Sequence, residues 1–237
     1  MIYNGFDFEP WMDTRLITRT FMPSMKVTTQ EVPYRQGERF ANARFEPLSI
    51  IVRARWKASV GDDMAALRRV MVDKLACFEE APLYVDDDRH LGIWYKAVLV
   101  NPGELDTLWY TGAAEFEFTA YDPIGYGEKR KATIGYNSNA WAGGSYEAWP
   151  VFTCTPGGNV SYLKLTNMDT GDYVQITRSL TSSSEVVIDM GNCKVLVDGA
   201  SVAPDFESIF FPLKPGANNL RLSSGSGTAE WTDRYIG

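Results

Sequence analysis

Residues 48–57 read LSIIVRARWK, and this stretch indicates the architecture of the first half of the chain. Every second residue from Leu48 to Trp56 is apolar, while Arg53, Arg55 and Lys57 fall on the alternate positions. A two-residue period is typical of a strand that buries one face and exposes the other. We therefore predict a strand here with a charged outer face.

Residues 114–121, AEFEFTAY, repeat this period and place Glu115 and Glu117 on the polar side. Between the two strands, apolar residues recur at intervals of three and four, which predicts an amphipathic helix over about residues 62–78. Asp62 and Asp63 stand where carboxylates accept hydrogen bonds from the free amides of a helix start. The apolar positions of this helix are Met64, Leu67, Met71, Leu75 and Phe78.

Residues 82–100, PLYVDDDRHLGIWYKAVLV, predict a strand, a polar turn over Asp86–Arg89 and a second strand. The three aspartates and His90 are also residue types that bind divalent cations. However, an EF-hand loop needs alternating ligands, a central glycine and a distal glutamate, and that pattern does not follow. The acidic turn is the favoured interpretation, and we expect no metal.

The second half of the chain shows no helical period and predicts an antiparallel sandwich. Short β-rich runs alternate with turn signals such as Asp198-Gly199 and Pro215-Gly216, as expected for strands that cross a small sheet and reverse. We place a domain boundary near Glu128, which gives domains 1–128 and 129–237, the second beginning with a linker. The predicted strands are 151–155, 161–166, 173–177, 185–189, 194–197, 209–213, 219–222 and 228–235.

Composition and charge exclude several classes of protein. The chain has 237 residues, 45% of them hydrophobic, and a net charge of −7. Residues 1–128 hold 20 acids and 14 bases, against 10 and 9 in the remainder, so the excess acid belongs to the first domain. A surface that binds nucleic acid needs clustered Lys and Arg, and we expect no specific binding of nucleic acid. We also expect no membrane insertion, because no apolar run approaches about 18 residues.

Catalysis has little support in the sequence. The single His90 removes most of the usual general-base chemistry, and Cys77, Cys154 and Cys193 are best interpreted as small buried hydrophobes. Three carboxylate pairs were considered for glycoside hydrolysis, and each is better explained by a helix end, a strand face or a loop. These pairs are Glu79 with Glu80, Glu115 with Glu117, and Asp205 with Glu207. We predict no catalytic residue, cofactor or metal.

Aromatic residues offer a separate possibility. Flat rings on an exposed sheet face can stack on sugars, although aromatic residues at turns and strand ends more often close a core or a subunit contact. Trp149 and Tyr162 are the two rings that such a glycan surface would use.

The order of motifs resembles the distal tail proteins of long, non-contractile-tailed bacteriophages. IYNGFDFEPW at residues 2–11 is similar to the family's first hairpin, residues 82–100 to its acidic hairpin, and AEFEFTAYDPIGYG at 114–127 to the end of its first domain. The second half resembles the strands of the family's galectin-like sandwich. The most recognisable motif is the final one, which consists of Leu213, Pro215, Gly216 and Asn218.

This resemblance implies a mainly β protein with one helix, an N-terminal sheet or split-barrel domain and a C-terminal galectin-like sandwich. It implies a homohexameric ring at the tail tip of the virion, made in the host bacterial cytoplasm, which encloses the DNA exit channel. Its partners would be the tail tube protein and the tail-tip hub protein. The edges of the strands that carry Arg53, Arg55, Lys57, Glu115 and Glu117 are the predicted ring contacts, and whether these charges meet within a subunit or between subunits stays open. The alternative is a carbohydrate-binding module that recognises host surface glycans through the sandwich.

Overall fold

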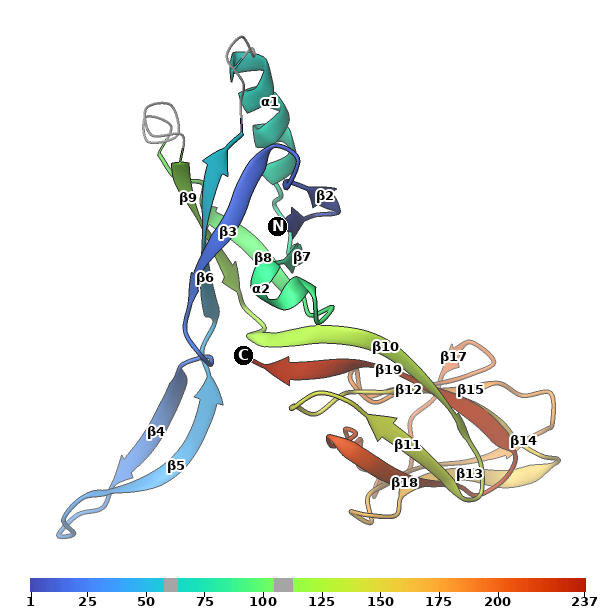
Figure 1. Ribbon diagram of the computed structural model, residues 1–237. Helices are drawn as coiled ribbons and strands as arrows, with labels where there is room; N and C mark the ends of the chain where they lie inside the picture. The colour runs from blue at the N-terminus through green and yellow to red at the C-terminus, as the bar shows by residue number, and fades with distance from the viewer. Residues whose placement is uncertain (58–63, 105–112) are drawn as a thin grey trace. The chain divides into compact units, whose positions relative to one another are not determined.

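The computed structural model describes residues 1–57, 64–104 and 113–237, and these form two compact units. The first unit contains Met1–Tyr126 together with Ile236–Gly237, and the second contains Gly127–Tyr235 (Figure 1). Strands β10 (Ile124–Ile134) and β19 (Ser226–Ile236) belong to both, because each begins or ends across the division.

The first unit is built on a seven-stranded antiparallel sheet with the strand order β2-β1-β7-β8-β9-β6-β3. Strands β6 and β9 have the predicted alternation, since Ile50, Val52 and Phe118 are buried while Arg53 and Glu115 face outward. The strands of this sheet are β1 (Ile2–Tyr3), β2 (Phe6–Asp7), β3 (Met12–Arg19), β6 (Leu48–Trp56), β7 (Ala81–Tyr84), β8 (Tyr95–Asn101) and β9 (Ala113–Ala120). Both strands that were predicted first are confirmed.

Helix α1 (Met64–Leu75) is shorter than the sequence predicted. Met71 and Leu75 are buried as expected, but Phe78 lies beyond the end of the helix and is fully exposed. The prediction that Phe78 belongs to the apolar face was wrong, because the helical hydrogen bonding ends before the chain reaches it. The capping role predicted for residues 62 and 63 lies outside the described residues.

The acidic turn between β7 and β8 is a single turn of helix, α2 (Asp86–Arg89). Three carboxylates in its first turn interact favourably with the free amides at a helix start. The two flanking strands pair as predicted, with Ala81 opposite Ala97. The prediction of one helix is therefore corrected to two within the described residues, the second only four residues long.

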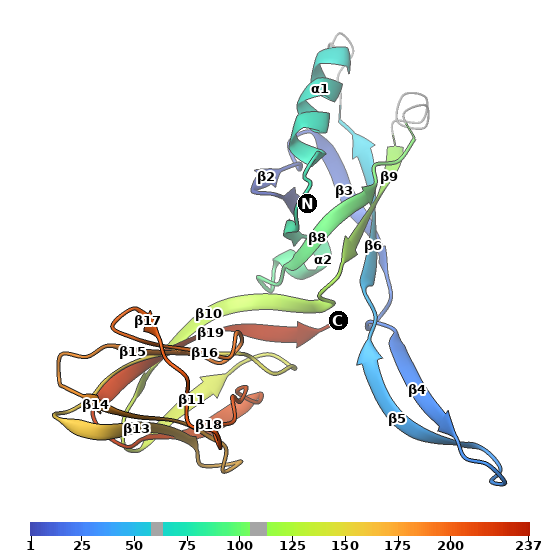
Figure 2. The same ribbon diagram turned by 180° about the vertical axis from the view of Figure 1, so that it is seen from behind.

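Strands β4 (Met25–Glu31) and β5 (Glu38–Phe45) form a two-stranded sheet of their own among the described residues. Figures 1 and 2 show the two strands running side by side in both views. Their side chains are exposed on both faces except for Ala43 and Phe45, which are half-buried. Without a buried face the sequence shows no apolar alternation, and this pair of strands was not predicted.

The second unit is a β-sandwich of two sheets. A six-stranded sheet has the order β10-β19-β12-β15-β16-β17, and a four-stranded sheet has the order β11-β18-β13-β14. One core joins them, since Phe152 of the first sheet and Leu163 and Leu165 of the second belong to the same buried cluster. The remaining strands are β11 (Ser138–Ala142), β12 (Val151–Thr155), β13 (Val160–Asn167), β14 (Tyr173–Leu180), β15 (Val186–Asp189), β16 (Lys194–Val197), β17 (Ala200–Ser201) and β18 (Gly216–Leu222).

Two parts of the sandwich differ from the sequence prediction. Residues 209–213 are not a strand, although Phe211 and Leu213 are buried. Leu213 makes one isolated bridge to Ala148, and Pro212 beside it has no amide hydrogen to donate to a ladder. The glycine-rich stretch assigned to a linker instead contains most of β10 and all of β11.

The fold class is confirmed as mainly β, and an antiparallel sandwich follows a sheet-based first unit. None of the helices in the described parts of the chain is long and apolar enough to span a membrane.

Candidate functional site: charged strands, a polar pocket and an exposed arm

The charged outer face of β6 and β9 is held together within one subunit. Arg53 lies directly opposite Glu115 in the register, and its Nε donates to a Glu115 carboxylate oxygen at 3.0 Å. Ser49 donates to the carboxylate of Glu117 at 3.0 Å. The arrangement left open by the sequence is therefore an intramolecular one for Arg53 and Glu115. Both side chains are more than half exposed, so this pair contributes only about 0–1 kcal/mol to stability.

The prediction that β6 and β9 offer free strand edges was wrong. Strand β6 pairs with β9 on one side and β3 on the other, and β9 pairs with β6 and β8. Arg53, Arg55, Lys57, Glu115 and Glu117 are thus carried by interior strands, while β2 and β3 stand at the edges of this sheet. The sequence period shows which face is buried but not the order of the strands in the sheet.

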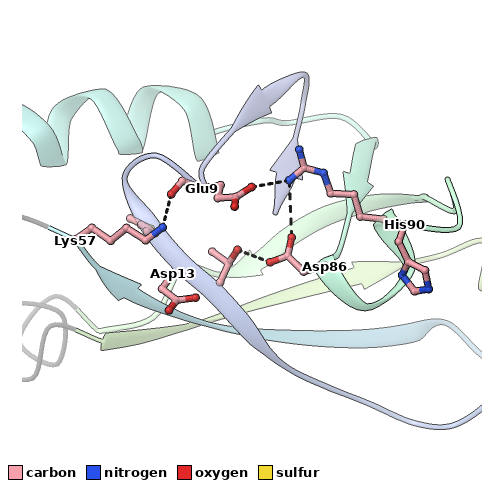
Figure 3. Close-up of a pocket in the computed structure, with 8 residues that line it drawn as sticks. Glu9, Asp13, Lys57, Asp86 and His90 are labelled. Atoms are coloured by element: carbon pink, nitrogen blue, oxygen red, sulfur yellow. Dashed lines mark hydrogen bonds and ion pairs between the residues drawn. The ribbon is translucent and has the colours of Figure 1, made fainter.

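A polar pocket of about 500 Å³ lies beside α2 (Figure 3). Thr14 donates to Asp86 at 2.9 Å, Arg89 donates to the Glu9 carboxylate at 3.1 Å, and the Lys57 ammonium donates to the Glu9 carbonyl at 2.7 Å. These bonds join the start of the chain, β3, the end of β6 and α2. The lining residues are Glu9, Met12, Asp13, Thr14, Lys57, Asp86, Arg89 and His90.

The rest of α2 is tied to β3 by Arg19. Its guanidinium contacts Asp88 at 2.5 Å and Asp87 at 3.1 Å, and it donates to the Tyr95 hydroxyl at 2.9 Å. Burial raises the pKa of Tyr95 to about 12 and also raises the pKa of Asp87, although Arg19 opposes the change at Asp87. The three aspartates of the acidic turn, favoured over a cation site in the sequence, are used in ion pairs. Among the residues that the structure describes, no three His, Cys, Asp or Glu side chains form a metal-binding group.

The carboxylate pairs considered for glycoside hydrolysis are also occupied or exposed. Asp205 accepts hydrogen bonds from the Thr177 hydroxyl at 2.7 Å and Gln175 at 2.8 Å, and the Tyr173 hydroxyl donates to Glu207 at 3.0 Å. The Thr177 hydroxyl is the main reason that the pKa of Asp205 is lowered. These bonds attach the 205–207 loop to β14.

The cysteines have different surroundings. Cys154 is buried in β12, where burial raises the pKa of its thiol to about 12, as suits a small core residue. Cys193 instead lies exposed in the turn between β15 and β16, with a positive φ of 51°. Cys77 is half-buried after α1 and donates weakly to the Glu79 carbonyl at 3.3 Å. The prediction of three buried thiols holds only for Cys154.

Of the two aromatic residues of the glycan interpretation, Tyr162 lies on a strand and Trp149 does not. Trp149 is 44% exposed and lies outside the strands, two residues before β12 and beside Gly191 in the turn between β15 and β16. Tyr162 is 47% exposed on β13 of the four-stranded sheet, opposite Thr177. The two residues therefore do not share the face of one sheet.

The Pro-Gly motif of the second half has a structural role. The Asn218 side chain is buried, accepts a hydrogen bond from the Lys214 amide at 2.9 Å, and donates to the carbonyls of Lys214 at 2.8 Å and Gly216 at 3.1 Å. Gly216 has a φ of 99°, which favours glycine. Asn218 thus holds the turn into β18.

The arm formed by β4 and β5 was not predicted from the sequence. Its apolar residues Met25, Val27 and Phe40 are 54%, 53% and 62% exposed. The composition of residues 26–30 is typical of a strand and could have indicated it. However, the segment has no buried face, so its apolar residues do not alternate with polar ones as they do in β6.

Comparison with known proteins connects this geometry with phage tails. Residues 143–235 match the family model described as a siphovirus-type tail component, C-terminal domain. A search of curated proteins found no match.

Solved structures with a similar fold include SPP1 Dit (gp 19.1), described as a paradigm of the hub adsorption apparatus in phages that infect Gram-positive bacteria. That protein is 14% identical to this chain, with a TM-score of 0.80, and the match covers 99% of this chain and 98% of that chain. The activated baseplate of phage p2 with Sr is 9% identical over 93% of this chain and 90% of that chain, with a TM-score of 0.46.

Proposed function

We propose, starting from the confirmed resemblance to the distal tail proteins of long-tailed phages, that this chain is a structural protein of the tail tip. In this proposal six copies form a ring that joins the tail tube protein on one side to the tail-tip hub protein on the other. The ring encloses the channel through which DNA leaves the virion. The role is one of assembly, and no catalytic step is assigned to any residue.

The observation that carries the proposal is the coincidence of two similarities in one chain. The family model of a siphovirus-type tail component falls on the C-terminal unit. The similarity of fold to SPP1 Dit extends over 99% of the chain and therefore includes the N-terminal unit. A fold alone does not assign a function, so the family match on the second unit is what directs the proposal to a phage tail.

The charge distribution is consistent with a channel for DNA. Residues 1–128 hold 20 acids and 14 bases, so this part of the chain has no excess of cations, and Arg53 on the face of β6 is paired with Glu115 within the subunit. A surface without an excess of cations gains little from counterion release, and DNA would pass it without binding.

Recognition of host glycans by the sandwich is the alternative. It needs coplanar exposed rings on one sheet face, but Tyr162 lies on β13 whereas Trp149 lies outside the strands. The ring proposal is therefore preferred. Glycan-array binding that is lost in both Trp149→Ala and Tyr162→Ala would favour the alternative.

Mass photometry and negative-stain microscopy of the purified chain test the proposal. A closed interface repeated by rotation gives one discrete assembly, so we expect particles of six times the 26.5 kDa subunit mass with a central hole. Co-purification with the tail tube protein and the hub protein of the same phage is the second expected result. A chain that stays monomeric at every concentration and binds neither neighbour would contradict the proposal.

A further inference from the structure

The outer face of the four-stranded sheet carries exposed side chains where β11 and β18 pair. These strands run side by side (Figure 1), with Trp141 opposite Ala217 and Asn139 opposite Asn219. Alternate residues such as Ala140 are buried in the sandwich core, so these four side chains point away from it. Strand β11 is an edge strand of this sheet. The side chains therefore form an open surface on the second unit.

Two aromatic rings lie at the two ends of this surface. Trp141 is 62% exposed, and Ala217 opposite it has no side chain long enough to cover an indole ring. Tyr136 is 58% exposed, and the Arg221 guanidinium lies 4.0 Å from the centroid of its ring. Arg221 follows Ala217 by four residues on the same face of β18, so the two ends lie roughly 13 Å apart along the strand. Neither ring is packed into the core, and both can contact another molecule.

Between the rings, Asn139, Asn219 and Asp169 form a polar row whose side chains fix one another. Asp169 accepts hydrogen bonds from the backbone amide of Asn219 at 2.7 Å and from its Nδ2 at 2.8 Å. The Oδ1 of Asn219 in turn accepts a hydrogen bond from Asn139 Nδ2 at 3.2 Å. Asp169 is itself positioned by the buried Asn167, whose Oδ1 accepts from the Asp169 amide at 3.0 Å. The bond from the Asn219 backbone is the main reason that the pKa of Asp169 is lowered, so this side chain is a carboxylate at neutral pH.

The hydrogen-bonding capacity that remains in the polar row suits hydroxyl groups. Each side-chain amide nitrogen has a second hydrogen to donate, and the oxygens of Asn139 and Asp169 have unused lone pairs. A hydroxyl group both donates and accepts, so neighbouring hydroxyls of one sugar can bond to an amide and a carboxylate together. Asp169 and Arg221 carry opposite charges, and the surface has no net charge for an ionic ligand. Phosphate groups in particular would meet the Asp169 carboxylate.

We propose that this surface is a binding site for a neutral oligosaccharide, which stacks one sugar ring on Trp141 and bonds its hydroxyl groups to the polar row. The apolar face of a sugar ring packs on an aromatic ring as other flat groups do. Tyr136 marks the far end of the site, so the ligand is a short chain of sugars rather than a single one. The site uses neither Trp149 nor Tyr162. The inference goes beyond the proposed function, because it adds glycan recognition to a protein of assembly and does not depend on the ring.

The first test is a glycan array probed with the purified chain. The probes are neutral oligosaccharides of glucose, galactose and N-acetylglucosamine, and calorimetric titration gives the affinity of each one that binds. We expect Trp141→Ala to weaken binding about tenfold or more. The matched control is Phe206→Ala, another exposed aromatic residue of the second unit, which should leave the affinity unchanged.

The polar row is tested by a second variant. Asp169→Ala removes an acceptor for hydroxyl groups and the partner that orients the Asn219 amide, so it should also weaken binding several-fold. Glu230→Ala is its control, because Glu230 is an exposed carboxylate on the other sheet of the sandwich. An affinity that falls equally in both variants would show a general effect of charge and would overturn the inference.

Two further measurements separate binding from folding and from charge. Trp141 is exposed, so Trp141→Ala should unfold at the wild-type temperature, and a lower temperature would show that its ring is packed within its own chain. Binding of a neutral ligand should change little between about 0.05 M and 0.5 M salt, because it offers no charge to screen. A steep dependence on salt would indicate a charged ligand. Either contrary result would overturn the inference.

The remaining outcomes identify a different occupant. If the wild-type chain binds no neutral oligosaccharide at millimolar concentrations, the inference is wrong. Binding that is lost in Trp149→Ala and retained in Trp141→Ala would place the glycan on the other aromatic residues. Loss of ring formation or of hub-protein binding in Trp141→Ala, with no glycan bound, would show that this surface contacts a protein. A chain that binds the oligosaccharide through Trp141 but forms no ring would contradict the proposed function and leave this inference standing.

Discussion

Asp233 is a buried carboxylate that joins three segments of the sandwich. It is fully buried, and it accepts hydrogen bonds from Arg130 Nε at 2.5 Å, the Gly143 amide at 2.8 Å and Trp231 Nε1 at 3.2 Å. These three donors offset the cost of burying the side chain, because each carboxylate oxygen accepts at least one hydrogen bond.

We predict that Asp233→Ala lowers the free energy of unfolding by about 2–4 kcal/mol, since it leaves buried donors without a partner. Denaturant titration followed by tryptophan fluorescence measures the change. Glu230→Ala is the control, because its pair with Lys131 is exposed on both sides and is worth at most about 1 kcal/mol. Equal losses in both variants would contradict the role assigned to Asp233.

Asn218 is a second residue whose hydrogen bonds stabilise the sandwich, in this case within a single turn. Replacement by alanine removes the acceptor of the Lys214 amide and the donor to the carbonyls of Lys214 and Gly216, and we predict a loss of about 2 kcal/mol in the free energy of unfolding.

Asn218→Asp distinguishes hydrogen bonding from packing, because the side chains have nearly the same size. Near neutral pH its carboxylate would face the carbonyls of Lys214 and Gly216, which raises its pKa in the folded state above the unfolded value. Because the folded state then binds the proton more tightly than the unfolded state, the free energy of unfolding of this variant relative to wild type should increase as pH falls towards about 4. A stability difference that does not change with pH would contradict this account of Asn218.

At the scale of elements, Arg19 joins the end of β3 to α2. It contacts Asp87 and Asp88, and the latter is buried. Because Arg19 is the last residue of β3 and the arm begins at Met25, this pair also fixes the chain shortly before the arm.

We predict that Arg19→Met destabilises the first unit by about 2–4 kcal/mol, because it leaves the Asp88 carboxylate buried without its cation. Asp88→Asn added to Arg19→Met should recover part of the loss, since a neutral amide needs no counterion. A double-mutant cycle by chemical denaturation measures the coupling. Strict additivity of the two single effects would contradict a direct ion pair.

At the scale of the whole molecule, the two units have separate cores. The sandwich core contains residues of the second unit only, and α2 with its ion pairs belongs to the first. Compact units with their own cores unfold as separate cooperative transitions when few contacts cross between them.

We predict two transitions in calorimetry of the dissociated chain. Asn218→Ala should lower the temperature of one transition, and Arg19→Met that of the other, each by several degrees. A single transition that both substitutions shift equally would show that the two units unfold together.

Strands that bury one face could be predicted from the sequence. Segments without a regular alternation of buried and exposed residues could not. The period of residues 48–57 predicted β6 because alternate side chains enter a core. The β4–β5 arm has no core face, Pro212 interrupts an apolar run that looks like a strand, and most of β10 lies in a charged and glycine-rich stretch. Alternation of apolar and polar residues indicates which side chains are buried. None of these segments shows the regular alternation of a strand with one buried face.

The sequence by itself determined the mainly β class, the sandwich, and the resemblance to distal tail proteins, because alternation and turn residues are local properties of the chain. Only the tertiary structure decided that β6 and β9 are interior strands, that Arg53 meets Glu115 within one subunit, and that Trp149 lies outside the strands while Tyr162 lies on β13. Strand order and the pairing of distant residues depend on long-range contacts, and a two-residue period is the same whichever neighbour a strand has.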